Sequence, residues 1–210
     1  MKKRPLRLLS LFVLCVLGFS TASYCEKNLA TYSVTDDAMS PSYAVDSQVL
    51  AWTHAYDSAS PQRGDVVLVE LPISQLGIWR AKGTKTLVRR IIGVPGDRIE
   101  FKRGVLTVNG RVQSEPFAKW IFTPAYDLKI VDGKVYTGDL GWWSLSYGLL
   151  GKGKQRHVVR AATQPIPPNH FLILGDNRHN SQDSVGLGLL PRSVFKGRVL
   201  MGGVPKIQIF

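Results

Sequence analysis

Short runs of β-branched and aromatic residues, separated by turn-forming residues, dominate the chain after its first 25 positions. Such runs are typical of β-strands, in which side chains alternate between the two faces of a sheet. The predicted strands are Ser47–Trp52, Asp65–Leu71, Thr86–Val94, Arg98–Phe101, Val105–Gln113, His170–Asn177 and Gly197–Val204. No long amphipathic helical pattern follows the first 25 residues. The pattern therefore predicts a mainly β fold built from antiparallel sheets.

Turn signals divide this region further. Asn109-Gly110 lies between apolar residues, which is a strong signal for a β-hairpin, and Pro95-Gly96-Asp97 indicates another tight turn. The stretch 117–168 is different, because it is rich in glycine, aromatic residues and lysine and has no clear period. We interpret it as an inserted lobe or a long loop within one domain that spans residues 26–210.

The first 25 residues form a segment of their own. Four basic residues within the first seven positions precede an apolar stretch, Leu8–Tyr24. A cleaved signal peptide, with Ser20–Ala22 before the cleavage site, and a membrane-anchoring helix both fit this pattern. In either case the basic residues stay on the cytoplasmic side and everything after Tyr24 is exported.

Composition narrows the classes of partner. The 210 residues are 44% apolar and 20% charged, as in ordinary globular proteins, and the net charge is +12. A basic surface suits anionic lipid headgroups or nucleic acid. Zinc-finger spacing, an RNP box and an aromatic-basic strip are all missing from the sequence, so we expect membrane lipids and no nucleic acid as partners. The four histidines lack metal-ligand spacing and no nucleotide motif occurs, so we expect no metal and no cofactor.

Four short motifs follow one another along the predicted strands. They are Ala38-Met39-Ser40-Pro41, Gly64-Asp65 with the apolar strand behind it, Arg89 to Asp97, and Gly175 to Ser184. Each is weak alone, but their number, order and spacing are specific. Through them the chain resembles the membrane-anchored signal peptidase I family of serine–lysine endopeptidases, which includes conjugation-type pilin-processing relatives.

The resemblance implies an antiparallel signal-peptidase-type fold. It favours an anchor for residues 1–25, with a single pass through the inner (plasma) membrane and the folded domain on the exported side. It also implies a shallow groove in which an extended peptide joins a sheet edge. Met39, Ser40 and Pro41 would line this groove. The fourth motif would lie near the site with residues Asp176, Asn177, Arg178, Ser181 and Asp183.

Three positions depart from the family's catalytic pattern. Ala38 stands where the nucleophilic serine belongs and offers only a methyl group. Arg89 stands where a lysine acts as general base, and a guanidinium cannot give up its proton in a protein. We expect Arg89 to bond instead to backbone carbonyls or to a carboxylate. Asp36 stands where a hydroxyl assists the oxyanion, and its carboxylate would repel a developing negative charge. Val185 also replaces an arginine that in many members can pair with the equivalent of Asp183.

Two hypotheses on function follow. The first is a non-catalytic member of the family that binds exported or signal-bearing peptides beside the membrane. The second is an active serine endopeptidase that removes signal peptides or processes pilin precursors with an atypical dyad, such as Ser40 with Lys82 or Lys85. On an extended strand Lys85 would lie about 13 Å from Arg89. Proton transfer needs a separation of about 3 Å, so this geometry argues for the first hypothesis.

Overall fold

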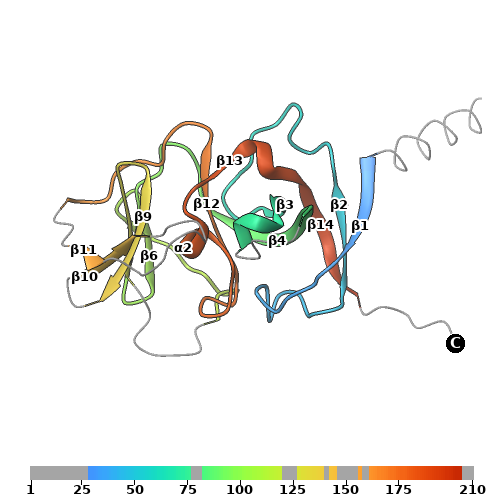
Figure 1. Cartoon of the computed structure of the whole chain (residues 1–210), viewed down its shortest axis with the longest axis horizontal. Helices are drawn as coiled ribbons and strands as arrows, with labels where there is room; N and C mark the ends of the chain where they lie inside the picture. Colours follow the sequence, from blue (N-terminus) through green and yellow to red (C-terminus); the bar gives the residue numbers. More distant parts are fainter. Residues whose placement is uncertain are drawn as a thin grey trace, which may run out of the picture.

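The computed structural model describes residues 28–76, 82–119, 127–139, 142–145, 156–157 and 161–204. These residues form two antiparallel sheets that lie side by side, with β12 between the two groups of strands (Figure 1). In spatial order the first sheet holds β1 (Leu29–Ser33), β2 (Gln48–Trp52), β14 (Phe195–Val204), β3 (Val66–Pro72), β4 (Thr84–Gly93), β12 (His170–Leu174) and β13 (Leu190–Pro191). The second holds β11 (Arg156–His157), β10 (Trp142–Leu145), β9 (Lys134–Asp139), β8 (Asp127–Val131), β5 (Ile99–Lys102), β6 (Val105–Val108) and β7 (Arg111–Val112). The helical elements that follow β1 in the described part of the chain are α2 (Ser184–Leu187) and two 3-10 turns, η1 (Ile73–Leu76) and η2 (Arg192–Val194).

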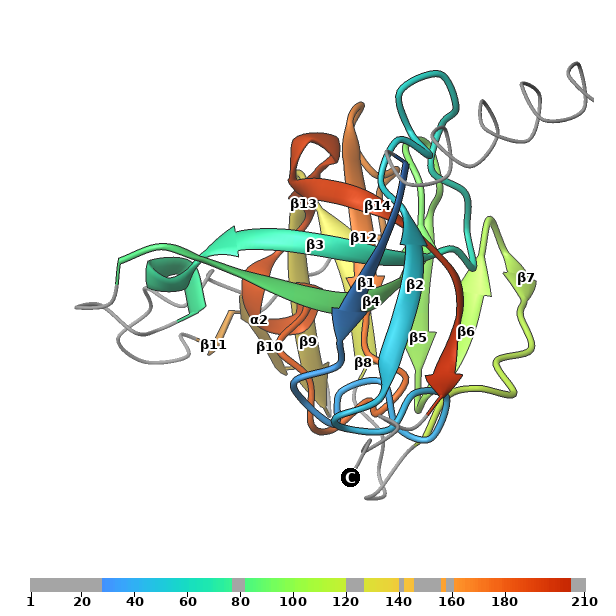
Figure 2. The same cartoon turned by 90° about the vertical axis from the view of Figure 1, so that its right-hand side faces the viewer.

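Strand β3, in the middle of the first sheet, is buried on both faces. Along β3 the side chains of Val67, Val69 and Leu71 enter one apolar cluster, whereas Val66 and Leu68 enter another. This division follows from the two-residue period of a strand. It also explains why β3 is almost continuously apolar rather than alternating. Figure 2 shows β1 beside β2 at one edge of this sheet.

Strand β12 joins the cores of the two sheets. Phe171 and Ile173 pack into the cluster that holds Val67 and its neighbours. Leu172 and Leu174 point the other way, into the cluster formed by the second sheet. The loop that follows β12 is therefore held between both halves of the fold.

Most strand predictions are confirmed. Each of the seven predicted runs contains an observed strand, and the Asn109-Gly110 hairpin turn connects β6 to β7 with φ values of 52° and 78°. Positive φ at both central residues is what a type I′ hairpin requires. The predicted strand His170–Asn177 ends earlier, at Leu174. Its last residues form the loop described below, because their polar groups bind neighbouring loops rather than a strand.

The stretch 117–168 contains strands that the sequence did not predict. Strands β8 and β9 pair with each other, and β8 pairs with β5, so the described part of this stretch extends the second sheet. Strand β8 was not predicted because Lys129 interrupts its run of apolar residues. Lys129 is nevertheless only 6% exposed and donates a hydrogen bond to the Ala161 carbonyl.

The predicted anchor in residues 1–25 lies outside the described residues. Within the part of the chain that the structure describes, no helix has the length and apolar character needed to cross a membrane.

Candidate functional site

Three segments that are distant in the sequence meet at the candidate site. The turn between β1 and β2 carries Asp36 and Ala38, β4 carries Arg89, and the loop after β12 carries the fourth motif. The main-chain N–H of Asn177 donates to the Ala38 carbonyl at 2.9 Å. The Nε of Arg89 donates to the Gln182 carbonyl at 2.9 Å. The fold thus brings together residues that the sequence analysis assigned to one site.

Arg89 is completely buried and bonded around its whole guanidinium. Its Nη1 and Nη2 atoms donate to the two carboxylate oxygens of Asp36, at 3.2 and 3.0 Å. Nη1 also donates to the Val88 carbonyl at 2.6 Å. These are the contacts expected from the sequence, namely backbone carbonyls and a nearby carboxylate. A guanidinium held in this way is a fixed positive charge and cannot accept a proton from a nucleophile.

Ala38 is 1% exposed, and its close contact with the loop after β12 requires a glycine at position 175. A Cβ atom on Gly175 would lie 2.5 Å from the Ala38 carbonyl oxygen, so only glycine allows the two loops to approach this closely. The main-chain N–H of Ala38 points to Asp36 and donates to its Oδ1 atom at 3.3 Å. The Asp36 carboxylate therefore lies against both Ala38 and Arg89.

The three residues expected to line a peptide groove differ in exposure. The side chain of Met39 is fully buried in the cluster formed by β2, β3 and β14, whereas Ser40 is half-buried and Pro41 is exposed. In this conformation only Ser40 and Pro41 present surface to a peptide. Met39 instead holds the turn on the core.

Ion pairs hold the fourth motif in place. The Nε and Nη2 atoms of Arg90 donate to the two carboxylate oxygens of Asp176, at 2.9 and 2.8 Å, and the same guanidinium lies 4.1 Å from the ring centroid of Phe117. Arg178 binds Glu115 in the same two-pronged way, at 3.0 and 2.6 Å. Paired hydrogen bonds of this kind fix orientation as well as position. The segment that contains Glu115 and Phe117 is thereby attached to the loop that contacts Ala38.

Other polar residues of the motif are buried beside Ala38. Asn177 is 2% exposed, and its Nδ2 donates to the Asp37 carbonyl at 3.3 Å. The Ser181 side chain is also buried, and its hydroxyl lies beside Gly175 and Asp183. Asp183 caps α2 by accepting from the Val185 N–H at 2.9 Å and also accepts from the Gly175 N–H at 2.8 Å. Burial raises the pKa of Asp183, although hydrogen bonds from these two N–H groups and from the Ser181 side chain, together with the charge of Arg89, act in the opposite direction.

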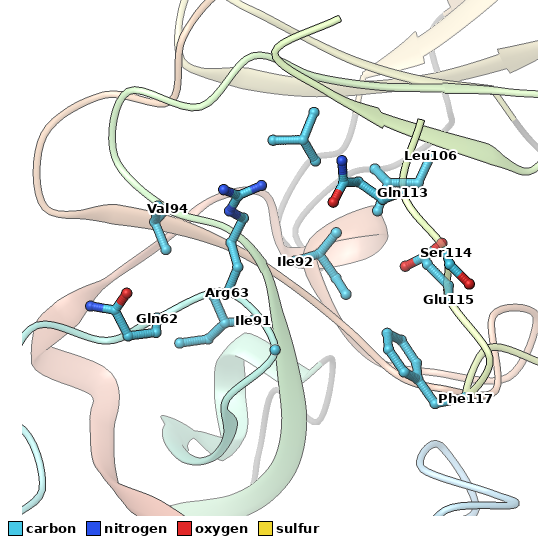
Figure 3. Close-up of a pocket in the computed structure, with 12 residues that line it drawn as sticks. Gln62, Arg63, Ile91, Ile92, Val94, Leu106, Gln113, Ser114, Glu115 and Phe117 are labelled. Atoms are coloured by element: carbon cyan, nitrogen blue, oxygen red, sulfur yellow. The ribbon is translucent and has the colours of Figure 1, made fainter. Parts of the chain in front are cut away.

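A separate cavity of about 470 Å³ lies between the end of β4, strand β6, the loop before β3 and the segment 113–117 (Figure 3). Arg63 lies in it, and its Nε is 3.4 Å from a carboxylate oxygen of Asp97. Neither Asp36, Ala38 nor Arg89 lines this cavity. It is therefore not the peptide groove that the resemblance implies.

Sequence reasoning missed two residues that support the site, Glu115 and Phe117. Both lie in an irregular segment after β7, where no motif or period marks them. Their roles depend on Arg178 and Arg90, which lie far away in the chain. Among the described residues, no group of three or more histidines, cysteines and acidic residues lies close enough together to hold a metal ion.

A family model and two relatives show which known proteins the chain is similar to. A family model described as "Signal peptidase, peptidase S26" matches residues 6–202. The chain is 28% identical over 200 residues to "Signal peptidase IB" of Staphylococcus aureus (strain Mu50 / ATCC 700699), a match that covers 95% of this chain and 89% of that protein. It is also 28% identical over 170 residues to "Signal peptidase I" of Bacillus caldolyticus, covering 81% of this chain and 76% of the relative. The crystal structure of a signal peptidase I from Enterococcus faecalis V583 matches with a TM-score of 0.38 at 20% identity, covering 68% of this chain and 98% of that one.

Proposed function

The chain belongs to the signal peptidase family, peptidase S26, and from this we propose that it is a non-catalytic member that binds exported or signal-bearing peptides beside the membrane. The observation that carries the proposal is the contact between Arg89 and Asp36. Peptide hydrolysis by this family's chemistry needs a serine oxygen, a neutral base and donors for the oxyanion. Here the three positions hold a methyl group, a buried guanidinium and a carboxylate.

The peptide-binding part of the proposal rests on β4. On the side of β4 that faces β12, strand pairing covers only Arg90, Ile91 and Gly93. Among the described residues, Thr84–Val88 have a strand partner only on the other side, where they pair with β3. An extended peptide can add to such an edge through main-chain hydrogen bonds. The edge ends next to Arg89, so a peptide bound there would reach the substituted site.

The location is part of the same proposal. The basic start and the apolar stretch Leu8–Tyr24 support a single-pass anchor in the inner (plasma) membrane, with residues 26–210 on the exported side. Membrane lipids would then lie close to the basic domain. A peptide that emerges from the membrane would meet the edge of β4 at a high local concentration.

The deciding experiment uses the full chain in detergent micelles and a synthetic signal-bearing precursor. We expect no cleavage product but measurable binding of the precursor's signal segment. Cleavage by the unmodified chain that is lost on Ser40→Ala would support the alternative, an active endopeptidase with a relocated dyad. A chain that neither cleaves nor binds the precursor would contradict both hypotheses.

A further inference from the structure

The main-chain N–H of Ala38 is already engaged by a group of the protein itself. Asp36 Oδ1 accepts from it at 3.3 Å and accepts at the same time from Arg89 Nη1 at 3.2 Å. In serine peptidases, N–H groups at the nucleophile position hold the oxygen of the peptide carbonyl. A carboxylate oxygen therefore lies where the oxygen of a peptide carbonyl would bind.

We propose that Asp36 is a built-in occupant of this carbonyl-binding position, and that its carboxylate lowers the affinity of the site for peptides. This inference rests on the proposed function, because it concerns the same peptide. A peptide that adds to β4 must either displace the carboxylate or leave its own carbonyl oxygen without the Ala38 N–H. Either route weakens peptide binding. Displacement breaks the hydrogen bonds of Asp36, and the other route leaves the peptide carbonyl without a hydrogen bond.

Arg89 prevents the carboxylate from moving away easily. Its guanidinium is completely buried and is fixed by the Gln182 and Val88 carbonyls at 2.9 and 2.6 Å. If Asp36 swung out, a buried positive charge would lose both of its carboxylate contacts, which is strongly unfavourable. Asp36 itself is 27% exposed, so it lies at the surface of the site, where a peptide would meet it.

The two substituted residues complement each other in this arrangement. A carboxylate at position 36 beside a neutral lysine would repel a peptide oxygen but would not be fixed by a two-pronged ion pair. Arginine supplies both the charge and the fork that hold Asp36 on the Ala38 N–H. Asp36 and Arg89 thus act as one unit that keeps the carbonyl-binding position occupied.

The test compares variants of the full chain by the Kd of a fluorescent, signal-bearing peptide with an Ala-x-Ala segment. Asp36→Ala alone leaves Arg89 buried without its partner, so the main variant is Asp36→Ala combined with Arg89→Met, which removes the carboxylate without adding a hydroxyl donor. Arg89→Met alone keeps the carboxylate and is the matched control. Asp57→Ser, an exposed carboxylate bonded to His54, is the control for loss of one negative charge.

We expect the double variant to bind the peptide about 3- to 10-fold more tightly than the unmodified chain, as one regained main-chain hydrogen bond implies. Asp57→Ser should leave the Kd unchanged, and Arg89→Met, which releases the carboxylate without removing it, should bind the peptide less tightly than the double variant does. A second measurement, hydrogen exchange at the Ala38 amide of the free protein, should show faster exchange in the double variant than in Arg89→Met.

Two outcomes would overturn the inference. If the double variant and Arg89→Met bind the peptide with equal Kd, Asp36 does not occupy the carbonyl position. If exchange at Ala38 is unchanged by removal of Asp36, the contact does not protect that amide. Absence of peptide binding in every variant would instead contradict the proposed function, and would also remove the claimed effect on affinity.

Discussion

The guanidinium of Arg89 binds both carboxylate oxygens of Asp36, although the two residues are separated by 53 positions in the chain. Along the sequence alone, Asp36 and Arg89 are two independent departures from the family's catalytic pattern. In the structure they neutralise each other beside Ala38. A change at either position therefore alters the environment of the other.

The stability of the fold should depend on this pair as a unit. We expect Asp36→Ala or Arg89→Met alone to lower the free energy of unfolding by about 2–4 kcal/mol, somewhat less than for a fully buried pair because Asp36 is 27% exposed. The combined variant should lose less than the sum of the two, with a coupling of about 1–3 kcal/mol. Urea unfolding of the four chains measures this cycle. Additive losses would show that the ion pair contributes little.

Restoring the nucleophile alone should not restore peptidase activity. Ala38→Ser supplies the hydroxyl but leaves Arg89 in place of the general base, whose loss typically costs about 10²- to 10⁴-fold in rate. It also leaves Asp36 on the amide that would stabilise the oxyanion, a loss of about 10²- to 10³-fold for one donor. We expect cleavage of a signal-bearing precursor to emerge only when Asp36→Ser and Arg89→Lys are added. Efficient cleavage by the single variant Ala38→Ser would contradict this account.

The buried carboxyl of Asp183 should make stability depend on pH. Because burial raises the pKa of Asp183 in the folded protein, its contribution to stability is complete below the pKa of the unfolded chain, about 4. It is lost as the pH rises through the higher pKa of the folded state. We therefore expect the stability difference between the unmodified chain and Asp183→Asn to shrink from pH 4 towards pH 8. Urea unfolding curves at several pH values measure this stability difference. A difference that grows with pH would show that the pKa of Asp183 is lowered in the folded protein and not raised.

Replacement of Arg90 by lysine should lower the stability of the fold. Lysine keeps the charge but cannot donate two parallel bonds to Asp176 or stack on Phe117 as a planar group. We expect Arg90→Lys to cost about 1–3 kcal/mol of stability, in the range of charge-assisted hydrogen bonds. Arg98→Lys, at an exposed residue that donates to the Thr163 carbonyl, is the matched control and should cost less than about 0.5 kcal/mol. Equal losses in a thermal unfolding series would argue against a special role for Arg90.

The orientation in the membrane can be tested directly. If residues 26–210 are exported and the basic start is cytoplasmic, protease added to the exported side should degrade the domain and leave a short N-terminal fragment. Disrupting the membrane beforehand should remove the protection of that fragment. Survival of the whole domain in intact spheroplasts would overturn the predicted topology.

Local patterns along the chain were enough to predict most of the first sheet, the β6–β7 hairpin and the family. Apolar runs rich in β-branched residues, such as that of β3, and turn residues such as Asn109-Gly110 act locally, so they can be recognised without knowing the partner strand. The missing chemistry could also be predicted from the sequence. Alanine has no nucleophilic atom, and arginine stays protonated in a protein, so it cannot act as a general base.

The contacts between distant side chains could not be predicted in this way. The pairing of Arg89 with Asp36, and of Arg178 with Glu115, depends on how loops are placed by strands far apart in the chain. Strand β8 was missed for the same reason, since its buried Lys129 is satisfied by Ala161, a partner that no local pattern reveals. Local sequence encodes the conformation of a segment, whereas a buried charge is stabilised by whatever the folded chain brings to it. The carboxylate on the Ala38 amide is a contact of that second kind.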